Sequence, residues 1–192
     1  MTGTVLGLFR HGQTDWNIDL RLQGTAEIPL NEYGMQQVAT AAYELKKHSW
    51  DLLLSSPLGR AKESAQIIQR ELQIPEVVIE PMLLERSFGV GEGMLYDQWQ
   101  EKYGQLEEIP GAESNASIRA RANDLLAEFS RKHSGARILA VSHGALIRYV
   151  LSEVTEGKVP PPGERLQNAS LHLLRHQANW ELDAWAPNSL GQ

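Results

Sequence analysis

The sequence is short of three things, and each deficit excludes a class of protein. It has no cysteine, which excludes disulfide bonds, thiolate nucleophiles and cysteine-ligated metals. It has no long apolar run near its start, where residues 4–9 span only about six residues, too few for a signal peptide or a membrane span. We therefore expect a cytoplasmic protein that does not associate with a membrane.

Basic residues are the third deficit. Lys and Arg number 18 against 24 Asp and Glu, for a net charge of −6. This balance argues against a nucleic-acid partner, which requires a basic surface. It does not argue against a small anionic substrate, because a local group of arginines can override the overall charge.

Length and composition fit one ordinary globular domain. The 192 residues suffice for a full core, and the apolar fraction of 42% and charged fraction of 22% are usual. No internal repeat, low-complexity tract or long linker divides the chain. We predict a single domain over residues 1–192 with a small cap inserted at about residues 90–113.

Short apolar runs alternate with segments of helical periodicity. Strands are predicted at residues 4–9, 51–55, 76–80 and 137–142, and helices at 32–47, 58–72, 114–133 and 144–155. This alternation is typical of an α/β fold: a three-layer sandwich with a mostly parallel central sheet flanked by helices.

The end of the chain follows a different pattern. A loop at 156–166, with three consecutive prolines, precedes two segments in which apolar residues alternate with others. Their alternating members are Ala169, Leu171 and Leu173, then Trp180, Leu182 and Ala184. We expect a terminal hairpin or edge pair of strands here.

Histidines and arginines stand where buried strands end. Arg10 and His11 follow the first strand, Arg60 follows the second, and His143 follows the strand at 137–142. Because the carboxyl ends of parallel strands share one sheet edge, these side chains should meet there. Arginine offers a planar fork of donors for phosphate oxygens, and histidine a nucleophile or proton carrier near neutral pH. The pattern predicts a phosphoryl-handling site.

Neighbouring residues suit such a site. Asn17, Arg21 and Gln23 carry hydrogen-bond donors for phosphate oxygens, although each alone is more typical of a solvated loop. Gly12 and Gly144 allow the backbone to approach an anion closely.

A proton donor for the leaving oxygen is also needed. Glu85 is the first candidate, because like-charge repulsion keeps a carboxyl beside a bound phosphate protonated. Glu92 and Glu113 are rivals, and an ion pair with a nearby arginine is the structural alternative for Glu85.

We expect neither metal nor cofactor. A metal site built from His11, His143 and Glu85 is disfavoured, since Arg10 and Arg60 would repel a divalent cation. The remaining histidines have no comparable setting and receive no function: His48, His133, His172 and His176.

Seven motifs in order resemble the histidine phosphatase superfamily, phosphoglycerate-mutase-like branch, and the resemblance covers nearly the whole chain. They are Arg10-His11-Gly12 with Thr14 and Asn17, Arg21-Leu22-Gln23-Gly24, Pro29-Leu30-Asn31 with Gly34, Ser55-Ser56-Pro57 through Arg60-Ala61, Leu84-Glu85 with Phe88-Gly89 and Glu92-Gly93, Pro110-Gly111 with Glu113-Ser114, and Val141-Ser142-His143-Gly144; Asn168-Ala169-Ser170 resembles the final strand.

The resemblance implies a metal-independent phosphatase acting on a small phosphate ester. His11 would accept the phosphoryl group as phosphohistidine, while Arg10, Arg60 and His143 hold its oxygens. Glu85 would protonate the leaving alcohol and then activate water. The substrate-binding set implied is Asn17, Arg21, Gln23, Gly24 and Gly144.

Two departures bear on the substrate. Gly91 stands where the family often has tryptophan, which predicts a roomier wall at that point. The stretch between Glu85 and His143 is shorter than in the glycolytic mutases, which favours access of water and hence hydrolysis.

Several alternatives stay open. One rival function is a mutase of the same family, and another is a non-catalytic phosphate-binding regulatory module. Within the cap, Met94, Tyr96, Trp99 and Tyr103 either contact substrate or only pack a short helix. The oligomeric state is open, and a homodimer is compatible with the sequence.

Overall fold

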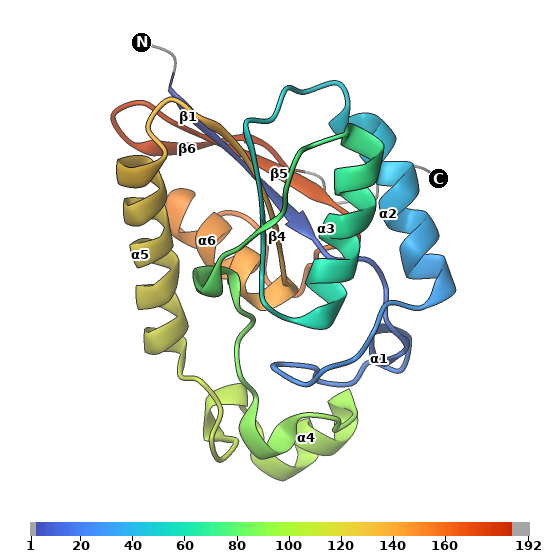
Figure 1. Ribbon diagram of the computed structural model, residues 1–192. Helices are drawn as coiled ribbons and strands as arrows, with labels where there is room; N and C mark the ends of the chain where they lie inside the picture. Colours follow the sequence, from blue (N-terminus) through green and yellow to red (C-terminus); the bar gives the residue numbers. More distant parts are fainter. Residues whose placement is uncertain (1–2, 186–192) are drawn as a thin grey trace.

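The computed structural model describes residues 3–185 and contains one six-stranded sheet (Figure 1). The strands follow the spatial order β3-β2-β4-β1-β5-β6. Their bounds are β1 Thr4–Arg10, β2 Leu52–Ser55, β3 Val78–Ile79, β4 Arg137–Ser142, β5 Leu171–His176 and β6 Trp180–Ala184.

Helices occupy most of the connections between strands. They are α1 Asp15–Ile18, α2 Glu32–Leu45, α3 Gly59–Leu72, α4 Tyr96–Tyr103, α5 Asn115–Lys132 and α6 Gly144–Val154. Three single-turn 3₁₀ helices lie at η1 Pro81–Leu83, η2 Gly89–Gly91 and η3 Leu106–Glu108. Among the residues described, no helix is both long and apolar enough to cross a bilayer.

The sheet is parallel except at one edge. β1 pairs with β4, β4 with β2, and β2 with β3, all in parallel. β5 runs antiparallel to β1, and β6 antiparallel to β5. The mostly parallel sheet and the terminal hairpin expected from the sequence are both confirmed.

Two apolar clusters cover the two faces of the sheet. Leu8 and Ala140 pack on one face with residues of α5 and α6, such as Leu125. Phe9 and Leu139 point to the other face and pack with residues of α2 and α3. Because adjacent strand residues alternate between faces, this arrangement makes the three layers seen in Figure 1.

Two elements differ from the sequence-based expectation. α1 was not predicted, because four residues are too few for a periodic pattern; a capping box between Thr14 and Asn17 forms it instead. β3 has two residues, Val78 and Ile79, where 76–80 was expected, and both are exposed on the sheet edge. The expected cap region contains α4 and η3 and lies beyond the carboxyl ends of the strands (Figure 1).

Candidate active site

The two strand-end histidines lie side by side. β1 and β4 are paired so that Arg10 is opposite Ser142, which places His11 and His143 together directly after the strands. Their ring centroids are 5.1 Å apart, and both residues are buried. The meeting of these side chains at one sheet edge, predicted from strand order, is what the structure shows.

Arg60 completes the group from the second residue of α3. Its Nε donates to His11 Nε2 at 3.2 Å, while Nη1 and Nη2 donate to the carbonyl oxygens of Ala26 and Gly24 at 2.8 and 2.7 Å. The loop after α1 therefore fixes the plane of the guanidinium. Gly24, expected in the substrate-binding set, does not line the cavity described below and instead positions Arg60.

His11 is held as a neutral imidazole. Its Nδ1 lies 2.7 Å from the carbonyl oxygen of Gly12, so this nitrogen carries the proton and donates it. Nε2 is then unprotonated and accepts from Arg60. Burial lowers the pKa of His11 well below its ordinary value, and the charges of Arg60 and Arg10 lower it further. Neutral imidazole is the nucleophilic form.

His143 is equally buried and has one uncommitted nitrogen. Its Nε2 lies 2.7 Å from Ser56 Oγ, whereas Nδ1 is buried without a hydrogen-bond partner. Burial lowers its pKa well below the ordinary value, with Arg60 and His11 adding to the effect. A buried ring nitrogen without a partner is costly unless a ligand satisfies it.

Arg10 provides a second fixed charge beside the histidines. Its Nη1 donates to the carbonyl oxygen of Leu166, and its Nε has no partner. Burial lowers its pKa to about 10, with the Glu85 carboxylate opposing the shift, so it stays charged at neutral pH. A desolvated guanidinium with a free donor is suited to an anion.

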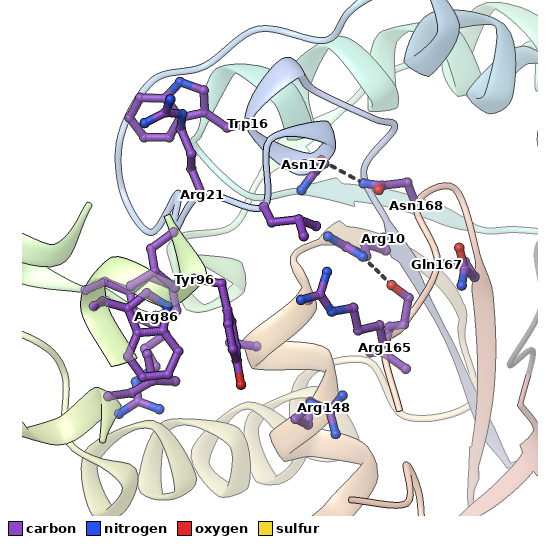
Figure 2. A pocket seen from close by; sticks show the side chains of 18 of the residues that line it. Arg10, Trp16, Asn17, Arg21, Arg86, Tyr96, Arg148, Arg165, Gln167 and Asn168 are labelled. Carbon is purple, nitrogen blue, oxygen red and sulfur yellow. Dashed lines mark hydrogen bonds between the residues drawn. The ribbon is translucent and has the colours of Figure 1, made fainter. Parts of the chain in front are cut away.

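Asn17 lines the cavity and offers its amide nitrogen to it, because its side-chain oxygen already accepts hydrogen bonds from other residues. Asn17 Oδ1 accepts from Thr14 N at 3.1 Å and from Asn168 Nδ2 at 3.1 Å (Figure 2). Asn168 Nδ2 also lies 3.0 Å from the carbonyl oxygen of His11. Asn168 thus ties the strand end that carries His11 to Asn17, a role that the sequence analysis did not assign to it.

Glu85 lies at the start of α6, beside the histidines. Its carboxylate accepts from the backbone amides of Ala145 at 3.0 Å, Leu146 at 3.1 Å and Arg86 at 2.9 Å. Ser142 Oγ donates to Leu83 O at 2.9 Å, which anchors this segment to the end of β4. Within residues 3–185 no ion pair involves Glu85, so the ion-pair alternative is wrong there.

The rival carboxylates are committed elsewhere. Glu113 accepts two hydrogen bonds from Arg121, at 3.0 and 2.8 Å; burial acts to raise the pKa of Glu113, but Arg121 lowers it overall. Glu92 accepts from Thr25 N at 2.9 Å and Phe88 N at 3.2 Å, joining two loops. Glu85 is the candidate whose charge acts on both Arg10 and Arg60.

A cavity of about 730 Å³ opens above this group (Figure 2). His11, Arg60 and His143 are buried beneath it, while Arg10 and Gly144, their neighbours, line it. The other lining residues are Gln13, Trp16, Asn17, Leu20, Arg21, Leu22, Arg86, Phe88, Tyr96, Trp99, Leu106, Asn115, Ala145, Arg148, Tyr149, Arg165, Leu166, Gln167 and Asn168.

The cap contributes two of its expected aromatic residues to this wall. Tyr96 and Trp99 line the cavity and meet edge to face, with ring centroids 5.2 Å apart. Trp99 is also buried, so its side chain both packs within the cap and lines the cavity. Tyr103 and Met94 do not line the cavity. Of the expected binding residues in the preceding loop, Arg21 lines the cavity and Gln23 does not.

The expectation of a roomier wall at Gly91 is wrong. Gly91 is buried and does not line the cavity. A Cβ there would lie 2.9 Å from Ile109 Cδ1 and 3.4 Å from Leu22 Cδ1, inside the packed cap. An indole at this position would displace core residues and would not fill a substrate wall.

Nothing in the described part of the chain resembles a metal site. No group of three or more histidine, aspartate or glutamate side chains there is arranged to hold an ion. The polar groups around His11 are donors and fixed positive charges, which suit an anion.

Comparison with known proteins agrees with this geometry. The sequence matches the histidine phosphatase superfamily (branch 1) over residues 6–187. It is 33% identical to the uncharacterized phosphatase PhoE of Bacillus subtilis (strain 168), over 97% of this chain and 96% of the relative. It is 34% identical to a metal-independent phosphoserine phosphatase of Arabidopsis thaliana, over 95% of this chain and 81% of the relative.

The fold comparison points the same way. A mycobacterial glucosyl-3-phosphoglycerate phosphatase in complex with VO3 superposes with a TM-score of 0.80 at 28% identity, covering 94% of this chain and 98% of that one. Proteins named as probable phosphoglycerate mutases are also among the relatives.

Proposed function

The chain belongs to the histidine phosphatase superfamily, branch 1, and from this premise we propose that it hydrolyses small phosphate monoesters through a phosphohistidine on His11, without a metal. One observation carries the proposal. The unprotonated Nε2 of a neutral, buried His11 lies 3.2 Å from Arg60, with Arg10 and His143 beside it. A nucleophile surrounded by fixed donors for oxygen is what phosphoryl transfer requires.

The first step transfers the phosphoryl group to the enzyme. Arg10, Arg60 and His143 bind the phosphoryl oxygens, and the Arg60 Nε–H, with its guanidinium plane held by Ala26 and Gly24, donates to those oxygens in place of His11 Nε2. The freed lone pair of His11 Nε2 attacks phosphorus, and the bond from phosphorus to the ester oxygen breaks. Glu85 gives its proton to the departing oxygen, which leaves as an alcohol.

The second step returns the enzyme to its starting state. Glu85, now a carboxylate, takes a proton from a water molecule that attacks the phosphohistidine. The bond between phosphorus and Nε2 breaks, inorganic phosphate forms, and His11 regains its neutral imidazole. The same oxygen-binding groups stabilise both transition states, so no metal ion is needed to hold the developing charge.

A mutase of the same family is the main alternative. It would form the same phosphohistidine but return the group to the bound molecule instead of to water. The phosphatases named among the relatives favour hydrolysis. A non-catalytic phosphate-binding module is disfavoured, because the nucleophile, its donors and an acid are all present in one site.

Phosphate release and product analysis test this proposal. The protein, treated with excess EDTA, should release inorganic phosphate from p-nitrophenyl phosphate and from small metabolite esters at an undiminished rate. Vanadate should inhibit, because it mimics the transferring group. With 3-phosphoglycerate, an isomer without free phosphate would identify a mutase. Activity lost with EDTA and restored by a divalent ion would refute the metal-independent route.

Two further predictions accompany this function: a single domain spanning residues 1–192 and a cytoplasmic location. The oligomeric state stays open, and a homodimer is compatible with the sequence. The proposed substrates are small phosphorylated metabolites. Because such metabolites occur in the cytoplasm, this substrate class supports the cytoplasmic location. Sedimentation or light scattering at micromolar concentration tests the homodimer, and a mass of one chain would refute it.

A further inference from the structure

The cavity carries more positive charge than one phosphoryl group requires. Five of its lining residues are arginines and none is aspartate or glutamate, although the whole chain has a net charge of −6. Arg10, together with the buried Arg60, serves the transferred group. Arg21 is paired with Asp19 at 3.2 Å. Three lining arginines remain: Arg86, Arg148 and Arg165.

Arg148 and Arg165 lie on the same wall as Arg10. Figure 2 shows Arg10, Arg165 and Arg148 on one side of the cavity, with Arg86 and Tyr96 across from them. Arg148 projects from α6, one turn after Gly144, and Arg165 comes from the segment that leads to β5. Burial is the main cause that lowers the pKa of Arg10, and the charges of Arg165 and Arg148 lower it further, in agreement with their place on the same wall.

Neither arginine has a carboxylate partner within ion-pair distance in the described residues. Arg148 donates to the backbone oxygen of Glu164. Burial lowers the pKa of Arg148, and the Glu164 carboxylate, which does not line the cavity, only partly opposes that shift. Arg165 has no hydrogen bond of its own there and is exposed toward the cavity. The charges of both arginines repel that of Arg10, and an anion bound on this wall would offset that repulsion.

We propose that Arg148 and Arg165 bind a second anionic group of the substrate, a carboxylate or a second phosphate, while Arg10 and Arg60 hold the phosphoryl group that is transferred. The preferred substrates are then small phosphate esters with a second negative charge a few bonds from the first. This inference rests on the proposed phosphatase function and names the substrate class of the same site.

Arg86 is the competing position for the second charge. It is 3% exposed, and its Nη2 is buried without a partner. However, its Nε donates to Glu113 O at 2.9 Å, and its guanidinium lies over the Phe88 ring, 5.7 Å from the centroid. Because Arg86 is across the cavity from Arg10, a small ester held at His11 reaches Arg148 and Arg165 more easily (Figure 2).

Three esters separate the contributions of the two anionic groups. Glycerol 1-phosphate has no second charge, 3-phosphoglycerate adds a carboxylate, and propane-1,3-diol bisphosphate adds a phosphate. We expect the wild-type protein to show kcat/KM at least about 10-fold higher for one or both charged esters, since hydrogen bonds between charged groups are stronger than neutral ones. The ester that is preferred identifies the second group.

Substitutions then locate the subsite. Arg148→Gln and Arg165→Gln should each lower kcat/KM for the preferred ester by about 10-fold or more. Glycerol 1-phosphate should change by no more than about 2-fold. Arg165→Lys should retain much of the preference, because it keeps the charge. Arg131→Gln is the matched control: it removes an exposed, Glu128-paired arginine of α5 and should change none of the three rates.

Each other outcome overturns the inference. Equal losses on all three esters would place these arginines with the transferred group, and a loss confined to Arg86→Gln would move the subsite to the cap. A wild type that hydrolyses glycerol 1-phosphate without preferring either charged ester refutes the subsite alone. A wild type that hydrolyses none of them refutes the phosphatase function as well. If Arg148→Gln does not fold, the exposed Arg165 variants decide.

Discussion

The base of the cavity and its cap wall are built by different means. At the base, His11, Arg60 and His143 are at most 2% exposed, and each is held by a hydrogen bond to another part of the chain. On the cap wall, Tyr96 is 41% exposed, and its ring meets that of Trp99 edge to face. The base is therefore preorganised for one reaction, whereas the wall can vary with little cost to the fold.

This difference suggests a division of roles, in which the base determines the rate of the reaction and the wall determines which substrates bind. A rigid set of donors lowers the barrier because it needs no reorganisation during the reaction. An exposed wall contributes to binding and affects the reaction only through the substrates it admits. Changes at the base should therefore lower turnover for all esters, and changes on the wall should alter the ratio between esters.

The largest effect is expected at Glu85. Glu85→Gln should slow hydrolysis of esters with alcohol leaving groups by about 10²- to 10⁴-fold, because the alkoxide then departs without a proton. Nitrophenyl phosphate, whose leaving group barely needs a proton, should lose far less. Steady-state rates on both esters measure this, with folding checked by circular dichroism. An equal loss on both would indicate that Glu85 only caps α6.

A smaller loss is expected at Asn168, which positions Asn17 and His11 without touching the reacting atoms. Asn168→Ala should lower kcat by about 10-fold on every ester, since small misplacements at a reacting centre are costly. KM should change less than kcat. Asn123→Ala, which removes a comparable amide on α5 far from the cavity, should leave both parameters unchanged. A loss confined to KM would assign Asn168 to substrate binding.

The cap wall should respond differently. Tyr96→Leu removes a ring that lines the cavity and should change KM by a few fold for bulky esters and less for small ones. Tyr43→Leu is the matched control, because Tyr43 is an exposed tyrosine of α2 outside the cavity. If Tyr96→Leu instead reduced kcat for all esters alike, the separation between base and wall would fail.

The smallest catalytic effect is expected at Gly91. Gly91→Trp overpacks the cap against Ile109 and should destabilise the fold by about 1–3 kcal/mol. The ratio of kcat/KM between a bulky and a small ester should stay unchanged, because position 91 does not line the cavity. Thermal unfolding and kinetics together test this. A ratio shifted against the bulky ester would return Gly91 to the substrate wall.

Strand order and residue chemistry were sufficient to predict the base of the site. Arg10 ends β1, and His11 and His143 directly follow β1 and β4, which are both buried strands. The carboxyl ends of parallel strands lie at the same edge of the sheet, whatever path the connecting helices take. The sheet and its flanking helices were predictable for the same reason: their periodic patterns extend over several residues. Four-residue α1 has no such pattern and depends on the side chains of Thr14 and Asn17.

Side-chain direction in the loops could not be predicted. Gly91 follows Val90 on a single 3₁₀ turn, and only the folded cap shows that it faces Ile109. Asn168 acts across 157 positions on the backbone oxygen of His11, a contact without a local signal. Two indications were available: its place just before β5, the strand that pairs with β1, and its place in the Asn168-Ala169-Ser170 motif of the family resemblance. Arg148 and Arg165 likewise line one cavity only because α6 and the segment before β5 pack together.

Trapping of the covalent intermediate tests the central claim most directly. Wild-type protein mixed with ³²P-labelled substrate and quenched rapidly in alkali should carry label that is stable to base and released by acid, as expected for phosphohistidine. Peptide mapping should place it on His11, and His11→Ala, folded by circular dichroism, should carry none and have no turnover. Label on another residue, or undiminished turnover by His11→Ala, would contradict the account.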